Sequence, residues 1–295
     1  MLKKISTMDK GILYMLFASF LFSIMGAFAK ELSQSMSSLE VVFFRNIFGV
    51  VLIGITILKT PIVQKGGKPL LLFFRGLMGF LALLAFFYNI AYISLADAMT
   101  FSKTSPIFTA FFAYVFLKEK LSVYGWIALF IGFVGIVLIT QPEGLMLKKT
   151  DILGIFSGIG AALAYTSVRE LKKFYDTRSI VLSFMMVGTV GPLVLLALEP
   201  FIHIEALDFM FAKFTMPSSK DWIFIVGLGV FATLAQVYMT KAYGETKAGI
   251  VGAVSYSNIV FAIILGLFLG DSFPSLTTSL GIMAIFIAGL LVLKK

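Results

Sequence analysis

The feature that most constrains this chain is a series of apolar stretches, each about 20 residues long, which is the length a helix needs to cross a bilayer. With 59% hydrophobic and 13% charged residues, the chain has too little polar surface to cover a soluble globule. We therefore expect an all-α membrane protein. The pattern predicts ten transmembrane helices, near residues 11–30, 39–59, 69–92, 97–117, 122–140, 152–171, 179–198, 221–243, 248–269 and 276–293.

The chain also contains an internal repeat. Residues 91–120 read AYISLADAMTFSKTSPIFTAFFAYVFLKEK, and residues 242–272 read AYGETKAGIVGAVSYSNIVFAIILGLFLGDS, at an offset of about 151 residues. A second marker is Lys-Glu-Leu at 30–32, which corresponds to Arg-Glu-Leu at 169–171. The offset is half of the 295-residue length and predicts two five-helix repeats, residues 1–145 and residues 146–295.

The loop charges predict how the repeats are oriented. Lys and Arg concentrate in the cytoplasmic loops of membrane proteins. With the N-terminus placed inside, sixteen of them fall on the inner side and five on the outer side, and the outer five are Lys30, Lys148, Lys149, Lys213 and Lys220. We expect both termini to be cytoplasmic in a cell (inner) membrane. Because five helices per repeat is an odd number, the second repeat is predicted to be inverted.

The net charge of +9 is accounted for by these loops, so no nucleic-acid partner is expected.

Short motifs over the whole chain resemble the EamA-type repeat of the drug/metabolite transporter superfamily. The first half carries them most clearly, and they are Arg75-Gly76, Tyr92, Leu95-Ala96-Asp97-Ala98, Ser105-Pro106, Leu117-Lys118-Glu119-Lys120, Trp126, Gly132, Gly135 and Gln141-Pro142. The second half departs from the pattern, with Ser257-Asn258 in place of Ser105-Pro106 and Gly270-Asp271 in place of Lys118-Glu119.

The resemblance implies a ten-helix secondary transporter that moves small metabolites, often amino acids or related compounds. It also implies a central cavity lined by the first, third, fourth, sixth, eighth and ninth helices. For Glu119 it suggests a structural or gating role.

A polar side chain deep in a bilayer is costly, so each one is a candidate for function. Lys103 lies about 10 Å into the fourth predicted helix, at 1.5 Å per residue. It precedes Ser105 and Pro106, and a proline in a helix removes a backbone donor and leaves the carbonyl of Ser102 without its helical partner. The sequence allows two interpretations: a substrate-binding lysine at a loosened helix, or a lysine that snorkels outward beside a simple kink.

Other polar residues within the predicted helices are candidates for substrate binding or for hydrogen bonds between helices. Besides Lys103 and Ser105, these are Asn258, Gln236, Asn89, Tyr88, Tyr165 and Tyr256. Packing contacts between helices are favoured for Asn89 and substrate contact for Asn258, which is near the centre of its helix. For Arg45 and Arg75, snorkelling or capping of neighbouring helices is favoured over attraction of an anionic substrate.

The groups that the sequence lacks narrow the function further. It has no Cys, its only His is His203 in a predicted outer loop, and no Asp or Glu falls in the middle of a predicted span. We therefore expect no metal, no cofactor and no enzyme activity, and the absence of a central carboxylate argues against proton coupling. The buried bases favour an amino acid-like or other carboxylate-bearing substrate, carried by alternating access.

The alternatives are a membrane scaffold or receptor without transport, or an intramembrane enzyme, and homodimer formation stays open.

Overall fold

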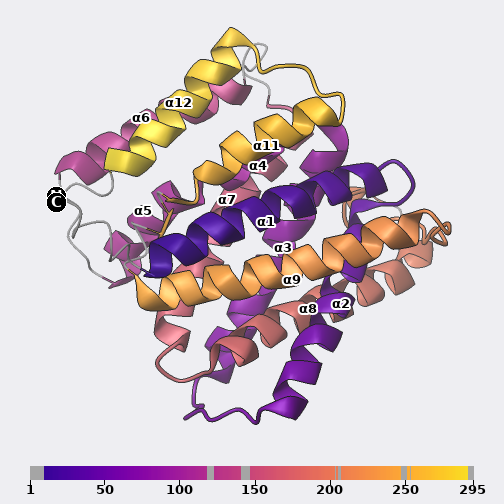
Figure 1. The fold of residues 1–295 in the computed structure, drawn as a ribbon. Coiled ribbons are helices and arrows are strands. Elements are labelled where there is room, and N and C mark those ends of the chain that lie inside the picture. Colours follow the sequence, from indigo (N-terminus) through magenta and orange to yellow (C-terminus); the bar gives the residue numbers. More distant parts are fainter. Residues whose placement is uncertain are drawn as a thin grey trace, which may run out of the picture.

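A computed structural model describes residues 10–117, 123–140, 147–202, 204, 207–246, 251–252 and 254–291. These residues form helices and connecting segments, without a β-strand among them (Figure 1). The helices are α1 (Lys10–Leu32), α2 (Ser38–Lys59), α3 (Pro69–Tyr92), α4 (Leu95–Ser102), α5 (Ser105–Leu117), α6 (Val123–Thr140), α7 (Lys149–Leu171), α8 (Thr177–Leu198), the short 3₁₀ helix η2 (Glu199–Phe201), α9 (Asp221–Glu245), α11 (Ser257–Phe268) and α12 (Leu276–Leu291).

Six helical stretches are long and apolar enough to cross a membrane, within the part of the chain that the structure describes. They belong to α1, α2, α3, α7, α8 and α9. The other four predicted spans correspond to α4 with α5, to α6, to the residues from 251 through α11, and to α12. The all-helical membrane fold predicted from the sequence is thus confirmed.

Two of the predicted spans are not continuous helices. Lys103 and Thr104 form a turn between α4 and α5, where one unbroken helix was expected over 97–117. In the predicted span 248–269, a turn at Ser255 and Tyr256 precedes α11. At both turns one backbone N–H is shared between the carbonyls three and four residues before it, a pattern common at helix ends.

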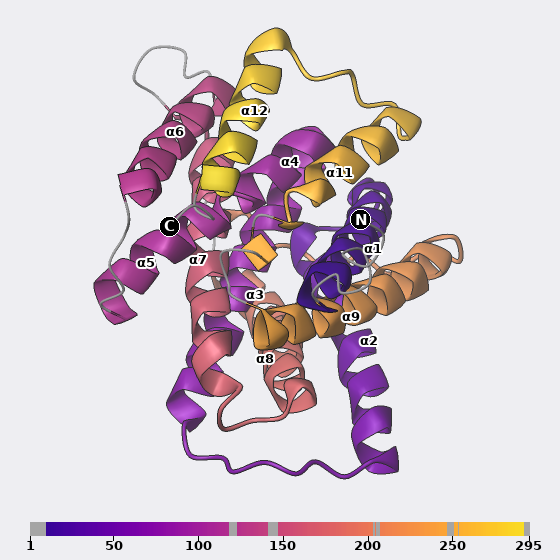
Figure 2. The same cartoon turned by 60° about the vertical axis from the view of Figure 1, so that its left-hand side comes forward.

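The helices pack mainly across the two halves of the chain (Figures 1 and 2). The first long helix of one half lies along the third long helix of the other, so that α1 packs on α9 and α7 packs on α3. Two further large contacts join equivalent helices, α2 with α8 and α6 with α12. This pairing is unchanged when the halves are exchanged, as a two-fold relationship between duplicated halves requires.

Small residues allow these close packings. A Cβ placed on Gly160 of α7 would lie 3.0 Å from the Cβ of Ala82 on α3. A Cβ on Gly135 of α6 would lie 3.0 Å from the carbonyl oxygen of Gly281 on α12. Helices in membranes associate through such close backbone approach, because lipid provides no hydrophobic drive between them.

Ion pairs join the helix ends. Lys30 Nζ, near the end of α1, lies 2.9 Å from Asp271 Oδ1, which follows α11. The other oxygen of Asp271 accepts a hydrogen bond from the backbone N–H of Leu95, the first residue of α4, at 2.9 Å. Asp271 therefore connects α1, α4 and the end of α11. The sequence did not predict this contact, because Lys30 was interpreted only as a loop charge.

A second group of charges joins the start of α3 to the end of α7. Lys173 Nζ donates to Glu170 Oε2 at 2.6 Å and Lys68 Nζ donates to Glu170 Oε1 at 2.8 Å. These two hydrogen bonds lower the pKa of the Glu170 carboxyl to about 2. The group therefore stays ionised at any physiological pH and links the two helices.

Candidate functional site

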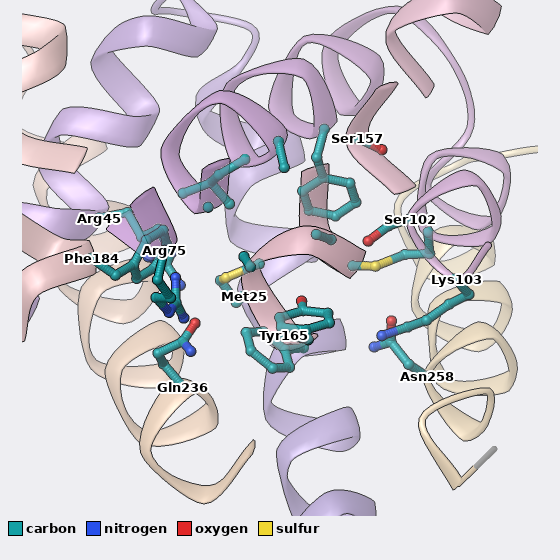
Figure 3. Close-up of a pocket in the computed structure, with 18 residues that line it drawn as sticks. Met25, Arg45, Arg75, Ser102, Lys103, Ser157, Tyr165, Phe184, Gln236 and Asn258 are labelled. Carbon is teal, nitrogen blue, oxygen red and sulfur yellow. The ribbon is translucent and has the colours of Figure 1, made fainter. Parts of the chain in front are cut away.

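A cavity that is partly open to solvent lies between the two halves. It is lined by α1, α3, α4 and α7, by Lys103 in the turn after α4, and by one residue each from α2, α8, α9 and α11. Its polar lining residues are Arg45, Arg75, Ser102, Lys103, Ser157, Tyr165, Gln236 and Asn258 (Figure 3).

One end of the cavity holds two arginines. The guanidinium carbons of Arg45 and Arg75 lie 5.0 Å and 4.4 Å from the ring centroid of Phe184, so both cations rest on one aromatic ring. Arg45 Nη1 donates to Asn46 Oδ1 at 2.7 Å. Figure 3 shows Gln236 next to the pair. This arrangement places two like charges side by side in the protein interior.

Both arginine side chains are only 1% exposed, and the Nε of each has no hydrogen-bond partner among the described residues. The snorkelling interpretation favoured from the sequence is therefore wrong for Arg45 and Arg75. Snorkelling would carry the guanidinium to water at the membrane surface, whereas α8 brings Phe184 over both groups and holds them inside. Each guanidinium has five N–H donors, so the pair retains donors for a ligand.

Lys103 and Asn258 line the other end of the cavity (Figure 3). Lys103 follows the last residue of α4, in the turn that separates α4 from α5. Its side chain reaches inward to the cavity, which contradicts outward snorkelling at this position. Ser102 lies beside it on the last turn of α4.

Asn258 is bound to α1 as well as facing the cavity. Its Nδ2 donates to Ser19 O at 2.8 Å and to Ser23 Oγ at 2.6 Å, and Ser23 Oγ donates to the Asn258 carbonyl oxygen at 3.1 Å. Both amide hydrogens are thus used by the protein. Asn258 Oδ1 is buried and has no donor within the described part of the chain.

Apolar and aromatic groups separate the two ends. Tyr165 of α7 lies between them together with Met25 of α1 (Figure 3). The Tyr165 ring stacks on Tyr243 of α9, with centroids 5.4 Å apart and planes 23° apart. This stacking fixes the ring against α9 of the same half. With Met25 beside it, the middle of the cavity is less polar than its ends.

Several of the residues predicted from the sequence do not line the cavity. Asn89 Nδ2 donates to the carbonyl oxygen of Thr150 at 2.9 Å and so joins α3 to α7, which agrees with the structural role favoured for it. The Tyr88 hydroxyl donates to Asp208 Oδ2 at 3.3 Å. Tyr256 is 1% exposed and packs edge-on against Phe286 of α12.

Ser105 and Pro106 form the first turn of α5 and are buried outside the cavity lining. Proline is well tolerated in a first turn, where its missing N–H has no helical partner to lose. Glu119 and His203 lie outside the described residues.

The sequence alone did not identify the packing partners of the site. Phe184 is one of 32 phenylalanines and gave no signal. Asn46 and Ser157 are uncharged but polar within predicted spans, which is the signal that could have found them. A stronger signal was available for Arg45 and Arg75, because an arginine about two turns from a helix end is costly unless something in the protein compensates it.

An all-helical membrane fold built around a buried, polar cavity between two halves belongs to the class of membrane transport proteins. Residues 9–141 and residues 148–294 each match the EamA-like transporter family, and the chain belongs to this family. The assignment agrees with the resemblance read from the sequence motifs and places the chain among transporters and not among intramembrane enzymes.

Relatives of known name are similar over nearly the full length. An uncharacterized transporter of Helicobacter pylori is 37% identical, with 96% of this chain and 94% of that protein covered. The pseudopaline exporter CntI of Pseudomonas aeruginosa is 32% identical over 95% of each chain. The S-adenosylmethionine uptake transporter of Rickettsia conorii is 22% identical, with 87% of this chain and 83% of that protein covered.

The fold also has a counterpart among solved structures. A protein crystal structure superposes with a TM-score of 0.64 at 15% identity and covers 96% of both chains. The arrangement of helices is thus retained where the sequence has largely diverged.

Proposed function

We propose that this protein is a secondary transporter for a small metabolite that carries an anionic group, with amino acid-like or other carboxylate-bearing compounds as the favoured cargo. The observation that carries the proposal is the charge of the cavity. Arg45, Arg75 and Lys103 line it, and no Asp or Glu is among the lining residues that the structure describes. Buried cations without a protein counter-charge are costly, and an anionic substrate offsets that cost.

The substrate site in this proposal comprises Lys103, Gln236, Tyr165 and Asn258 from the sequence-based candidates, together with the two arginines. Ser105, Asn89, Tyr88 and Tyr256 stay predictions, and their places outside the cavity favour structural roles. Pro106 and Glu119 stay candidates for helix interruption and gating.

We infer alternating access by two inverted halves, residues 1–145 and 146–295, in the cytoplasmic membrane with both termini inside. The symmetric pairing of α1 with α9 and of α7 with α3 supports this, because two related halves can exchange their contacts during a cycle. The excess of Lys and Arg in alternate loops supports the orientation. Relatives named for export and for uptake share this framework, so the proposal covers either direction.

The alternative function, a membrane scaffold or receptor without transport, does not explain a polar cavity between the two halves. A protein that only holds partners together gains nothing from placing Arg45, Arg75 and Lys103 around an interior cavity. The cavity therefore favours transport. Whether two copies associate stays a prediction.

Metabolite profiling tests the cargo without assuming one. A deletion strain is compared with an overproducer, and an overproducer of Lys103→Ala at equal membrane abundance serves as the matched control. We expect the compounds that change between the first two strains, and not in the control, to carry a carboxylate or another anionic group. If only cationic or neutral compounds change, the proposal is wrong. Uptake of the identified compound into proteoliposomes then measures transport directly.

Cysteine labelling tests the orientation. The natural chain has no Cys, so single substitutions report without background. Lys213→Cys is expected to react with a membrane-impermeant maleimide in intact cells, and Lys65→Cys only after lysis, because both residues are exposed in connecting segments. The reverse pattern would place the termini outside.

A further inference from the structure

We propose that the cavity takes a molecule with two carboxylate groups, one bound by Arg45 and Arg75 and the other by Lys103. The inference rests on the proposed function and deepens it from an anionic cargo to a dicarboxylate. It follows from how the cationic groups are distributed along the cavity, which the sequence does not reveal.

The cationic groups form two separate sites. Arg45 and Arg75 share the ring of Phe184 at one end, and Lys103 lies at the other end beside Asn258, with Tyr165 and Met25 between them (Figure 3). A single carboxylate that reaches the arginines leaves Lys103 unneutralised. A carboxylate that reaches Lys103 leaves both arginines unneutralised.

The arginine end has the geometry for a carboxylate. A guanidinium presents its donors in a planar fork that matches two carboxylate oxygens. Phe184 holds the two guanidiniums by their faces, and Nη1 of Arg45 is bound to Asn46 Oδ1 at 2.7 Å. Arg45 Nε and Arg75 Nε are buried and unpartnered among the described residues, so the protein leaves donors at this end unused.

The lysine end completes the charge balance. Lys103 is placed by the turn after α4, and no described salt bridge includes it. Ser102 adds a hydroxyl next to it. An ammonium is a compact charge that can donate hydrogen bonds to a carboxylate approaching from several directions. The less polar middle, formed by Tyr165 and Met25, suits a hydrocarbon chain between the two carboxylates (Figure 3).

Thermal unfolding of the purified full-length protein in detergent tests the inference, because a ligand that binds the folded state raises the midpoint temperature. The probes are the linear dicarboxylates from succinate to pimelate and the monocarboxylates with the same numbers of carbons. We expect at least one dicarboxylate to bind about tenfold or more tightly than its matched monocarboxylate, the gain typical of one added charge-assisted contact.

Variants assign the two ends. Lys103→Met is expected to lower the affinity for that dicarboxylate to the affinity for the matched monocarboxylate. The affinity for the monocarboxylate should stay unchanged. Arg75→Met is expected to weaken both probes. Lys59→Met, at the exposed end of α2, is the charge-matched control and is expected to change neither. Lys103→Arg keeps the charge and retains the dicarboxylate preference, which separates loss of the ligand contact from loss of folding.

Equal binding of matched mono- and dicarboxylates, equal weakening of both by Lys103→Met, or no binding of any dicarboxylate overturns the inference. Binding of monocarboxylates without a dicarboxylate advantage overturns it while leaving an anionic cargo in place. The proposed function itself fails separately, when the metabolite profile contains only cationic or neutral compounds.

Discussion

The turn at Lys103–Thr104 and the turn at Ser255–Tyr256 have the same backbone pattern and different side chains. Lys103 N–H is shared between Met99 O and Thr100 O, at 3.0 Å each. In the second half, the N–H of Ser255 is shared between Val251 O at 3.0 Å and Gly252 O at 3.1 Å. A new helix begins two residues later in both cases.

Their side chains serve different purposes. The first turn directs Lys103 into the cavity, whereas its counterpart Ser255 is buried and donates to its own helix at Gly252 O, 2.7 Å away. Two residues after the second turn comes Asn258, whose amide hydrogens hold α1. The comparison teaches that both copies keep the interruption of the helix, while the charge that faces the cavity lies in one copy and an anchor to α1 lies in the other.

The largest expected effect is the loss of transport when the charge of Lys103 is removed and the turn between α4 and α5 is kept. Lys103→Met is expected to lower transport into proteoliposomes by about tenfold to a hundredfold, because a lost charge-assisted contact costs about 1.5–3 kcal/mol. The unfolding temperature without ligand should not fall, since Lys103 has no ion pair among those described. Transport at the natural rate would show that the two turns do not differ in function.

The second-largest expected effect is on stability, and it comes from the packing of the Lys103–Thr104 turn against α7. A Cβ at Gly158 would overlap Thr104 Oγ1 and lie 3.0 Å from Phe101 O, so Gly158→Ala is expected to destabilise the protein by about 1–3 kcal/mol. Gly54→Ala on α2 is the control, because nothing lies within 4 Å of its Cβ position. The control is expected to be neutral or slightly stabilising in thermal unfolding. An equal loss in both variants would mean that the turn is not held by this contact.

The anchor of the second turn is expected to act on stability more than on transport. Asn258→Ala removes the hydrogen bonds to Ser19 and Ser23 and should cost about 1 kcal/mol, within the range for polar contacts between membrane helices. Ser23→Ala should cost less when Asn258 is already absent, which a double-mutant cycle measures. Additive losses, or a transport defect as large as that of Lys103→Met, would contradict the anchoring role.

The smallest expected effect is that of the proline. The second half interrupts its helix with Asn258 at the position that Pro106 occupies in the first half. Pro106→Ala should therefore keep the turn, shift stability by no more than about 1 kcal/mol and change transport less than threefold, since a proline in a first turn disrupts nothing. A large loss of transport would show that the first turn depends on its proline.

The sequence by itself determined the class of structure and the family. A bilayer demands about 20 apolar residues for each spanning helix and makes every polar residue within one costly, so spans and unusual residues can be read directly. Lys103, Gln236, Tyr165 and Asn258 were identified as candidates in this way, and all four line the cavity. The two interruptions were not predicted, because both segments were expected as unbroken helices.

Only the tertiary structure decided which polar groups meet. Arg45 and Arg75 come together because α8 brings Phe184 between α2 and α3, a contact between residues more than a hundred positions apart. Asn258 became an anchor because α1 presents Ser19 and Ser23 to it. Local sequence specifies how each helix meets the lipid, but the partner of a buried polar group is set by helices distant in the chain, and that packing separates a binding residue from a structural one.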